Sequence, residues 1–156
     1  MKTPDPTEFR HALSRFTTGV TVLTAAEADG TVAGMTANSF TSVSLAPPTI
    51  LVSVMQGRTL KAIEAAGMFV VNVLGAGAER ISGHFAGKPV PGWTPDFAAF
   101  GNYVGLDGAL ANFACRVQRR VEVNDHVLLI AEVEHCHACE ADPLVFYGSR
   151  YRRLAA

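Results

Sequence analysis

The sequence has no uninterrupted apolar run approaching the ~20 residues that a helix needs to cross a bilayer. Residues 1–6 also lack the apolar core of a signal peptide. We therefore expect neither a membrane-spanning segment nor a secretory leader, and no membrane among the partners.

Charged residues are few, and neither sign predominates. Charged residues make up 17% of the chain, and 13 Lys and Arg residues against 14 Asp and Glu residues give a formal net charge of −1. Nucleic-acid-binding proteins usually carry a basic face or a run of Lys and Arg. No such run is present, so we do not expect nucleic acid as a partner.

Cysteine occurs only three times. This odd, small number does not suit the disulfide framework of a small secreted domain, and it predicts the reducing cytoplasm as the compartment. Hydrophobic residues, by contrast, make up 49% of the 156 residues. Such a composition predicts one globular domain over residues 1–156, with a sizeable core and part of its surface covered in an oligomer.

Short apolar and alternating segments predict a mainly β protein with short helices. Strands are expected at residues 20–25, 32–37, 50–54, 68–74, 113–123, 127–134 and 144–147. Six or seven strands with short helices between some of them favour a closed or split β-barrel over a parallel sheet.

Helix signals lie between these strands. The first helix is predicted to begin at the cap Thr7 and to end at Gly19, and the second to begin at the cap Thr59 and to stop at Gly67. Residues 76–85 also have helical character. By contrast, residues 87–102 are rich in Gly and Pro, so we expect an irregular excursion there and consider it a candidate lid.

Residues 34–54 organise the chain. Small and hydroxylated residues come first, a double proline follows, and a β-branched apolar run completes the stretch. Hydroxyls and an amide between strands supply neutral donors and leave the backbone close to a ligand, which suits a phosphorylated, planar cofactor. The alternative is that these side chains only cap local turns.

Two further motifs imitate known sites. Residues 75–80 (GAGAER) follow a strand as a dinucleotide-binding motif would, but the third glycine is replaced by Arg80, so a dinucleotide fold is not expected. His135, Cys136, His137 and Cys139 lie within five positions and suggest a zinc-binding interaction module. A structural zinc site normally draws ligands from two separated segments, so we favour an exposed strand end and expect no metal.

Motifs along nearly the whole chain resemble those of the short flavin reductases, the reductase components of two-component flavin monooxygenases. They are Phe9-Arg10, FTTGVTVLT at 16–24, the stretch 34–54, GMFVVNVL at 67–74, Phe85-Ala86, GALANFAC at 108–115, Asp125-His126, PLVFY at 143–147 and Arg150-Tyr151. The resemblance implies an FMN-binding split β-barrel that forms a homodimer with the flavin near the interface.

The resemblance also implies roles for individual residues. Those matching positions that contact the cofactors are Thr36, Ala37, Asn38, Ser39, Ser53, Val54, Arg58, Thr59, Phe85, Arg150 and Tyr151. Among them, residues 36–39 match the segment around the isoalloxazine edge and ribityl chain, and Arg58 and Thr59 fall where the phosphate is held, at a helix start. Arg150 and Tyr151 match contacts to the nicotinamide dinucleotide.

His126 matches the histidine that family members place beside the nicotinamide. We expect it to orient the dinucleotide as a hydrogen-bond donor rather than to shuttle protons. Two departures from the family pattern stand out: Ala46 replaces the Asp that usually precedes the double proline, and Asn124 replaces a Gly before Asp-His. Asn tolerates left-handed φ, so the turn at Asn124 should survive.

The sequence thus predicts an NAD(P)H-dependent flavin reductase that transfers a hydride from reduced nicotinamide to FMN or FAD. Such a reaction needs stacking and alignment more than an acid or a base. Reduced flavin would pass to a partner monooxygenase. The alternative is a non-catalytic flavin-binding protein on the same barrel. The sequence does not distinguish FMN from FAD or NADH from NADPH.

Overall fold

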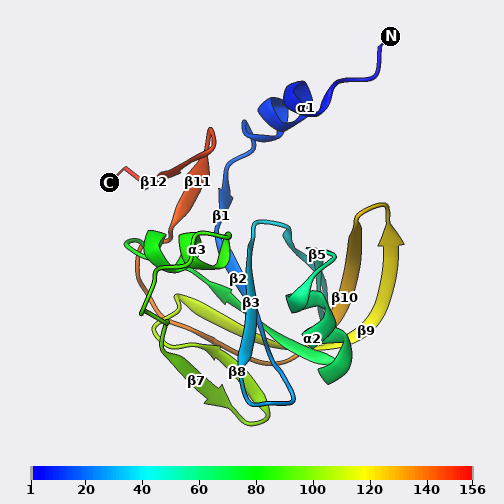
Figure 1. The fold of residues 1–156 in the computed structure, drawn as a ribbon, viewed down its shortest axis with the longest axis vertical. Coiled ribbons are helices and arrows are strands. Elements are labelled where there is room, and N and C mark those ends of the chain that lie inside the picture. The colour runs from blue at the N-terminus through cyan, green and yellow to red at the C-terminus, as the bar shows by residue number, and fades with distance from the viewer. Residues whose placement is uncertain (1, 156) are drawn as a thin grey trace.

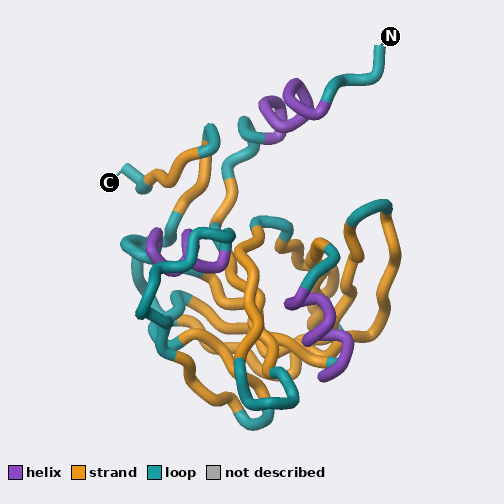
Figure 2. Tube along the Cα trace, in the orientation of Figure 1, coloured by secondary structure: helices purple, strands orange, loops and turns teal. Residues whose placement is uncertain are grey.

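The computed structural model describes residues 2–155 and consists mostly of strands (Figures 1 and 2). Its helices are α1 (Pro6–Leu13), α2 (Arg58–Ala66) and α3 (Glu79–Phe85). Its strands are β1 (Thr18–Gly19), β2 (Thr21–Ala26), β3 (Val32–Ala37), β4 (Phe40–Leu45), β5 (Pro48–Met55), β6 (Met68–Val73), β7 (Phe97–Phe100), β8 (Tyr103–Leu106), β9 (Ala111–Val123), β10 (His126–Ala138), β11 (Val145–Tyr147) and β12 (Arg150–Arg152). Within the described range no helix has the length and apolarity needed to cross a membrane.

Seven strands form one sheet in the order β3-β2-β6-β9-β10-β5-β4. All neighbouring pairs are antiparallel, which excludes the dinucleotide-binding fold that residues 75–80 imitate. The edge strands β3 and β4 follow each other in the chain and are joined by Asn38 and Ser39. Ala33 of β3 and Ile50 of β5 belong to one core cluster, so the sheet curls until its edges approach. The predicted mainly β split barrel is confirmed.

Helix α2 fills the interior of this curled sheet. Leu60 and Ile63 are buried in the main core cluster, as the sequence predicted. Gly67 ends the helix with φ 68, a left-handed conformation that glycine adopts at little cost. The predicted cap is wrong: Gly57 is the N-cap, and Thr59 lies inside the first turn with its side chain buried.

The start and end predicted for α1 are also wrong. Asp5 is its N-cap and accepts hydrogen bonds from the backbone nitrogens of Thr7 (2.8 Å) and Glu8 (3.0 Å). Asp caps a helix better than Thr, and a proline in the first turn fits the cap at Asp5. The helix ends at Leu13, well before Gly19, which instead pairs with Val145 across β1 and β11.

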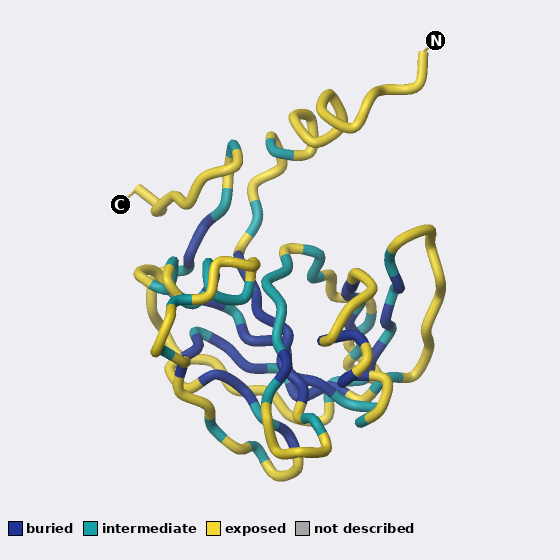
Figure 3. Tube along the Cα trace, in the orientation of Figure 1, coloured by how far each residue is buried: buried dark blue, intermediate teal, exposed yellow. Residues whose placement is uncertain are grey.

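Helix α1 stands away from the barrel, and the small sheet β1-β11-β12 lies between the helix and the barrel (Figures 1 and 3). No residue of α1 is buried, and Phe9, Leu13 and Phe16 are 56%, 56% and 76% exposed. The helix therefore has an apolar face that its own chain does not cover.

The excursion at residues 87–102 is less irregular than predicted. It leads into a β-hairpin of β7 and β8 that packs on the outer face of the barrel. Buried Asn72 of β6 accepts a hydrogen bond from the backbone nitrogen of Leu106 (2.7 Å), and Thr24 donates to the carbonyl of Val104 (2.6 Å). These bonds fix β8 to the sheet, so the hairpin in which the excursion ends is anchored.

The predicted turns that precede β5 and β10 are confirmed. Pro47 lies in the turn between β4 and β5, at the edge of the sheet, and Pro48 begins β5. Asn124 has φ 54 in the turn between β9 and β10, as expected for the residue that replaces glycine there. The hairpin is longer than predicted, because β10 continues through the motif at residues 135–138.

Candidate functional site

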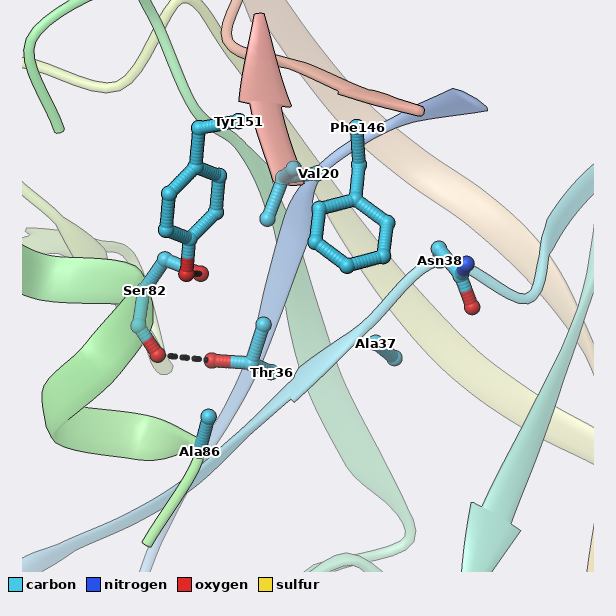
Figure 4. A pocket seen from close by; sticks show the side chains of 8 residues that line it. All are labelled: Val20, Thr36, Ala37, Asn38, Ser82, Ala86, Phe146 and Tyr151. Carbon is cyan, nitrogen blue, oxygen red and sulfur yellow. Dashed lines mark hydrogen bonds between the residues drawn. The ribbon is translucent and has the colours of Figure 1, made fainter. Parts of the chain in front are cut away.

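A cavity of about 220 Å³ lies where four segments of the chain converge, next to the connection between the sheet edges (Figure 4). It is lined by Val20, Thr36, Ala37, Asn38, Ser82, Ala86, Phe146 and Tyr151. Three of these belong to the predicted flavin segment, and Tyr151 to the predicted nicotinamide contacts. The fold thus brings together residues that are more than 110 positions apart in the chain.

Hydrogen bonds join the walls of this cavity. The Thr36 hydroxyl donates to the carbonyl of Ser82 (2.7 Å), and the Tyr151 hydroxyl donates to Ser82 Oγ (2.8 Å). The ring of Phe146 packs edge-on against Tyr151, with centroids 5.7 Å apart. Two aromatic rings therefore face hydroxyl and amide groups across the cavity.

Phe85 supports this wall from behind. A Cβ placed on Gly34 would lie 2.5 Å from a ring carbon of Phe85, so the ring packs directly on the glycine backbone. Phe85 also packs against the core cluster that contains Val22 and Leu74. In this structure the predicted contact residue is thus a support for β3 beside the cavity.

A second hollow, of about 460 Å³, lies on the other side of Asn38. Its lining is rich in hydroxyls and consists of Phe16, Thr17, Thr18, Gly19, Thr21, Asn38, Ser39, Phe40, Thr41 and Val73. Thr18 Oγ1 is buried without a hydrogen-bond partner. Such an atom is costly unless a ligand or water satisfies it, so this hollow suits a polar ligand chain.

Ser39 and Ser53 form a pair between the flavin segment and β5. Ser39 Oγ accepts a bond from the Ser53 backbone nitrogen (3.1 Å) and donates to the Ser53 carbonyl (2.9 Å). The pair therefore ties the start of β4 to β5. The next predicted contact residue, Val54, is fully buried in the barrel core and lines neither of the two hollows described above.

Arg58 and Thr59 stand apart from both hollows. The Arg58 guanidinium forms an ion pair with Glu27 and donates to Thr31 Oγ1 (3.2 Å), at the turn between β2 and β3. Hydrogen bonding to Glu27 raises the pKa of Arg58. Thr31 and Asn38 flank the opposite ends of β3, about 23 Å apart at ~3.3 Å per residue.

His126 begins β10 at the tip of the long hairpin. Its Nδ1 lies 2.8 Å from Asp125 Oδ1, and this hydrogen bond lowers the pKa of the Asp125 carboxyl. His126 pairs with Met55, and Ser53 with Leu128, so His126 is two strand spacings and two residues from Ser39. That is about 12 Å. His126 thus lies beyond the walls of either hollow, on the side of Ser39.

Arg150 is exposed on β12 and pairs with Tyr147 of β11. The motif at residues 135–139 also lies outside the cavities around Asn38. His135 and His137 are two positions apart on β10 and line a small pocket on the outer face of the barrel. Among residues 2–155, no three His, Cys, Asp or Glu side chains are grouped closely enough to hold a metal ion.

Ser82 and Phe146 line the cavity although neither was predicted as a site residue. Phe146 lies within the motif at 143–147, which carried the resemblance but gave it no role. Ser82 lies inside a predicted helix, where a serine is an ordinary residue. The only available signal was its spacing of three from Phe85, which predicts that both lie on one helix face.

The curled antiparallel sheet, the hydroxyl-rich connection between its edges and the aromatic wall from the C-terminal strands define a split-barrel protein of the flavin-binding class. The chain matches the model of the flavin reductase like domain over residues 13–155, and it belongs to that family. The sequence-based assignment to the flavin reductases is thus confirmed.

Individual relatives are similar over nearly their whole length. The NADH-dependent flavin reductase StyB of Pseudomonas fluorescens is 43% identical over 153 residues, which cover 94% of this chain and 89% of that protein. The reductase component of 4-hydroxyphenylacetate 3-monooxygenase of Thermus thermophilus is 38% identical over 148 residues, covering 94% and 95%. The structure of flavin reductase PheA2 in its native state superposes with a TM-score of 0.93 at 38% identity, covering 98% of this chain and all of that chain. These relatives are oxidoreductases of the kind that the sequence predicted.

Proposed function

We propose that this protein is a flavin reductase that reduces FMN or FAD with NADH. The observation that carries the proposal is the cavity in which Thr36, Ala37 and Asn38 face Tyr151. Its neutral donors and aromatic rings fit a planar cofactor held by modest hydrogen bonds. The relative StyB, whose name describes it as an NADH-dependent flavin reductase, supports NADH as the reductant.

Bound flavin supplies the hydride acceptor, and the chain supplies the surface on which two rings meet. Residues 36–38 hold the flavin edge through the Thr36 hydroxyl, the Asn38 amide and backbone groups. Tyr151 and Phe146 cover the opposite side and exclude water. His126, held by Asp125, orients the dinucleotide from the side of Ser39. Alignment of reacting atoms alone can lower a barrier greatly, so no acid or base is needed.

The polar chain of the flavin is proposed to occupy the hydroxyl-rich hollow beside Asn38. Ser39 and the unpartnered Thr18 hydroxyl belong to the lining of that hollow, whose hydroxyl groups fit the ribityl oxygens. Ser53 supports Ser39, and Val54 and Phe85 support the strands behind the site. Arg58 and Thr59 remain the proposed phosphate contacts. Arg58 must then exchange Glu27 for the phosphate.

We further propose a homodimer that passes reduced flavin to a separate monooxygenase in the cytoplasm. The uncovered apolar face of α1, with Phe9 and Leu13, supports a second subunit. The name of the Thermus relative, a monooxygenase reductase component, supports the partner enzyme. Three free thiols in the described chain support a reducing compartment. We also propose that residues 1–156 form a single domain and that neither nucleic acid nor a membrane is a partner.

The test is anaerobic titration of the flavin-loaded protein with NADH. Bleaching of the flavin absorbance and steady NADH oxidation with added FMN or FAD are expected. A protein that binds flavin but is not bleached by NADH or NADPH would be the non-catalytic flavin-binding alternative. Sedimentation of the same sample at micromolar concentration tests the dimer, and an active monomer would exclude it.

A further inference from the structure

Ser82 is the point at which three walls of the cavity meet. It lies in α3, is 1% exposed, and contacts β3 and β12 through different atoms. Its carbonyl accepts the Thr36 hydroxyl, and its side-chain oxygen accepts the Tyr151 hydroxyl. Figure 4 shows Ser82 between these two side chains. One residue thus connects the proposed flavin side of the cavity with the proposed nicotinamide side.

The two hydrogen bonds use different atoms of Ser82, so a substitution can remove one and keep the other. The carbonyl bond to Thr36 belongs to the backbone and persists whatever side chain stands at position 82. The bond from Tyr151 needs the Ser82 hydroxyl itself. Tyr151 is 37% exposed on a short strand whose three residues are all exposed. Without the bond to Ser82, its phenol ring would keep the edge-on contact with Phe146 but lose the hydrogen bond that fixes its hydroxyl end.

We propose that Ser82 is a positioning residue, whose hydroxyl holds Tyr151 at a fixed distance from the Thr36 wall so that the nicotinamide fits between the tyrosine and the flavin. The inference rests on the proposed function and adds to it a residue that touches neither reacting atom. Its consequence is that loss of the hydroxyl weakens NADH binding and leaves the flavin contacts in place.

The variants are Ser82→Ala and Tyr151→Phe, each of which deletes the same hydrogen bond from one side. Alanine favours the helix at least as well as serine, so α3 should persist. Tyr147→Phe is the matched control, because Tyr147 is also 37% exposed and lies on the paired strand β11, where it contacts Arg15 instead. The double variant Ser82→Ala/Tyr151→Phe completes the cycle.

We expect each single variant to raise the KM for NADH by about 3–10-fold, the effect of one hydrogen bond. The kcat and the flavin Kd should stay within about twofold, and Tyr147→Phe should behave as the wild type. The double variant should be no worse than either single one, because both changes remove one shared bond. A merely structural role would lower thermal stability and flavin affinity without this non-additivity.

Three results would each overturn the inference. The first is a KM for NADH in the double variant that is raised by the product of the two single effects. The others are an unchanged KM for NADH in the single variants and a loss of flavin binding in Ser82→Ala. If Ser82→Ala does not fold, the test is the comparison of Tyr151→Phe with Tyr147→Phe. An equal KM for NADH in these two variants would overturn the inference. A wild-type protein that oxidises no NADH in the presence of flavin would instead overturn the proposed function itself.

Discussion

Asp125 Oδ1 lies 2.8 Å from Nδ1 of His126, at the tip of the hairpin between β9 and β10. The carboxylate engages one ring nitrogen and leaves Nε2 for a ligand, which fixes the orientation of the imidazole. The lowered pKa of Asp125 keeps its carboxylate ionised throughout the neutral range. This arrangement suits a histidine that orients a dinucleotide.

His126→Ala should lower kcat/KM for NADH by ~10–100-fold, the loss expected for one positioning contact. Flavin affinity should stay nearly intact, because His126 is about 12 Å from Ser39 by strand spacing. Asp125→Asn, which keeps the shape and removes the charge, should give a smaller loss of the same kind. Steady-state kinetics and flavin titration measure both. Wild-type NADH kinetics in His126→Ala would show that His126 is a solvated turn residue that does not contact the dinucleotide.

Arg58→Ala should weaken the binding of FMN by ~10–100-fold, since a charge-assisted phosphate contact contributes about 1.5–3 kcal/mol. Riboflavin, which lacks the phosphate, is the matched ligand and should bind equally well before and after the change. The ion pair with Glu27 is not a strong competitor, because Arg58 is 65% exposed and exposed pairs contribute about 0–1 kcal/mol. Flavin titrations decide, and equal losses for both ligands would exclude a phosphate contact.

Sequence reasoning located the local features of this fold well. Three local features were predicted correctly: the helix end at Gly67, the turn at Pro47 and the turn at Asn124. Each depends on the backbone conformations that one residue type can adopt, and the residue type is known from the sequence. Both helix caps were predicted at the wrong residue, because Asp5 caps α1 two positions before Thr7 and Gly57 caps α2 two positions before Thr59. The role of Ser82 depends on its contact with Tyr151, 69 positions away. Contacts of that kind come from tertiary packing, and one sequence carries no direct signal for them.

The pKa of Tyr103 is raised to about 12 because burial disfavours the phenolate and because Tyr103 donates a hydrogen bond to Glu134. The folded state therefore binds this proton more tightly than the unfolded state, whose tyrosine pKa is about 10. The stabilisation is fully present below pH 10 and is lost as the pH rises towards 12. Unfolding by urea across this range should show the loss in the wild type and a smaller one in Tyr103→Phe. An equal alkaline loss in both proteins would contradict the assignment.

Asn72 interrupts an otherwise apolar strand and is fully buried. Its Nδ2 donates to the carbonyl of Val22 (2.8 Å), and its Oδ1 accepts from the backbone nitrogen of Leu106 (2.7 Å) and from Asn112 Nδ2 (2.8 Å). The side chain thus links the strands β2, β8 and β9 around β6. Removing it leaves several buried polar groups without partners, and each such group costs about 1–3 kcal/mol.

Asn72→Ala should therefore lower the free energy of unfolding by about 3 kcal/mol or more, which corresponds to a Tm lower by roughly 6–12 °C in a chain of this size. Asn102→Ala, in the exposed turn of the same β7–β8 hairpin, is the control and should stay within about 0.5 kcal/mol of the wild type. Urea denaturation followed by circular dichroism measures both. Because Asn72 faces the hairpin and not the cavity around Asn38, the folded fraction of Asn72→Ala should still bind flavin. Equal stability of the two variants would show that the hairpin is held by its apolar contacts alone.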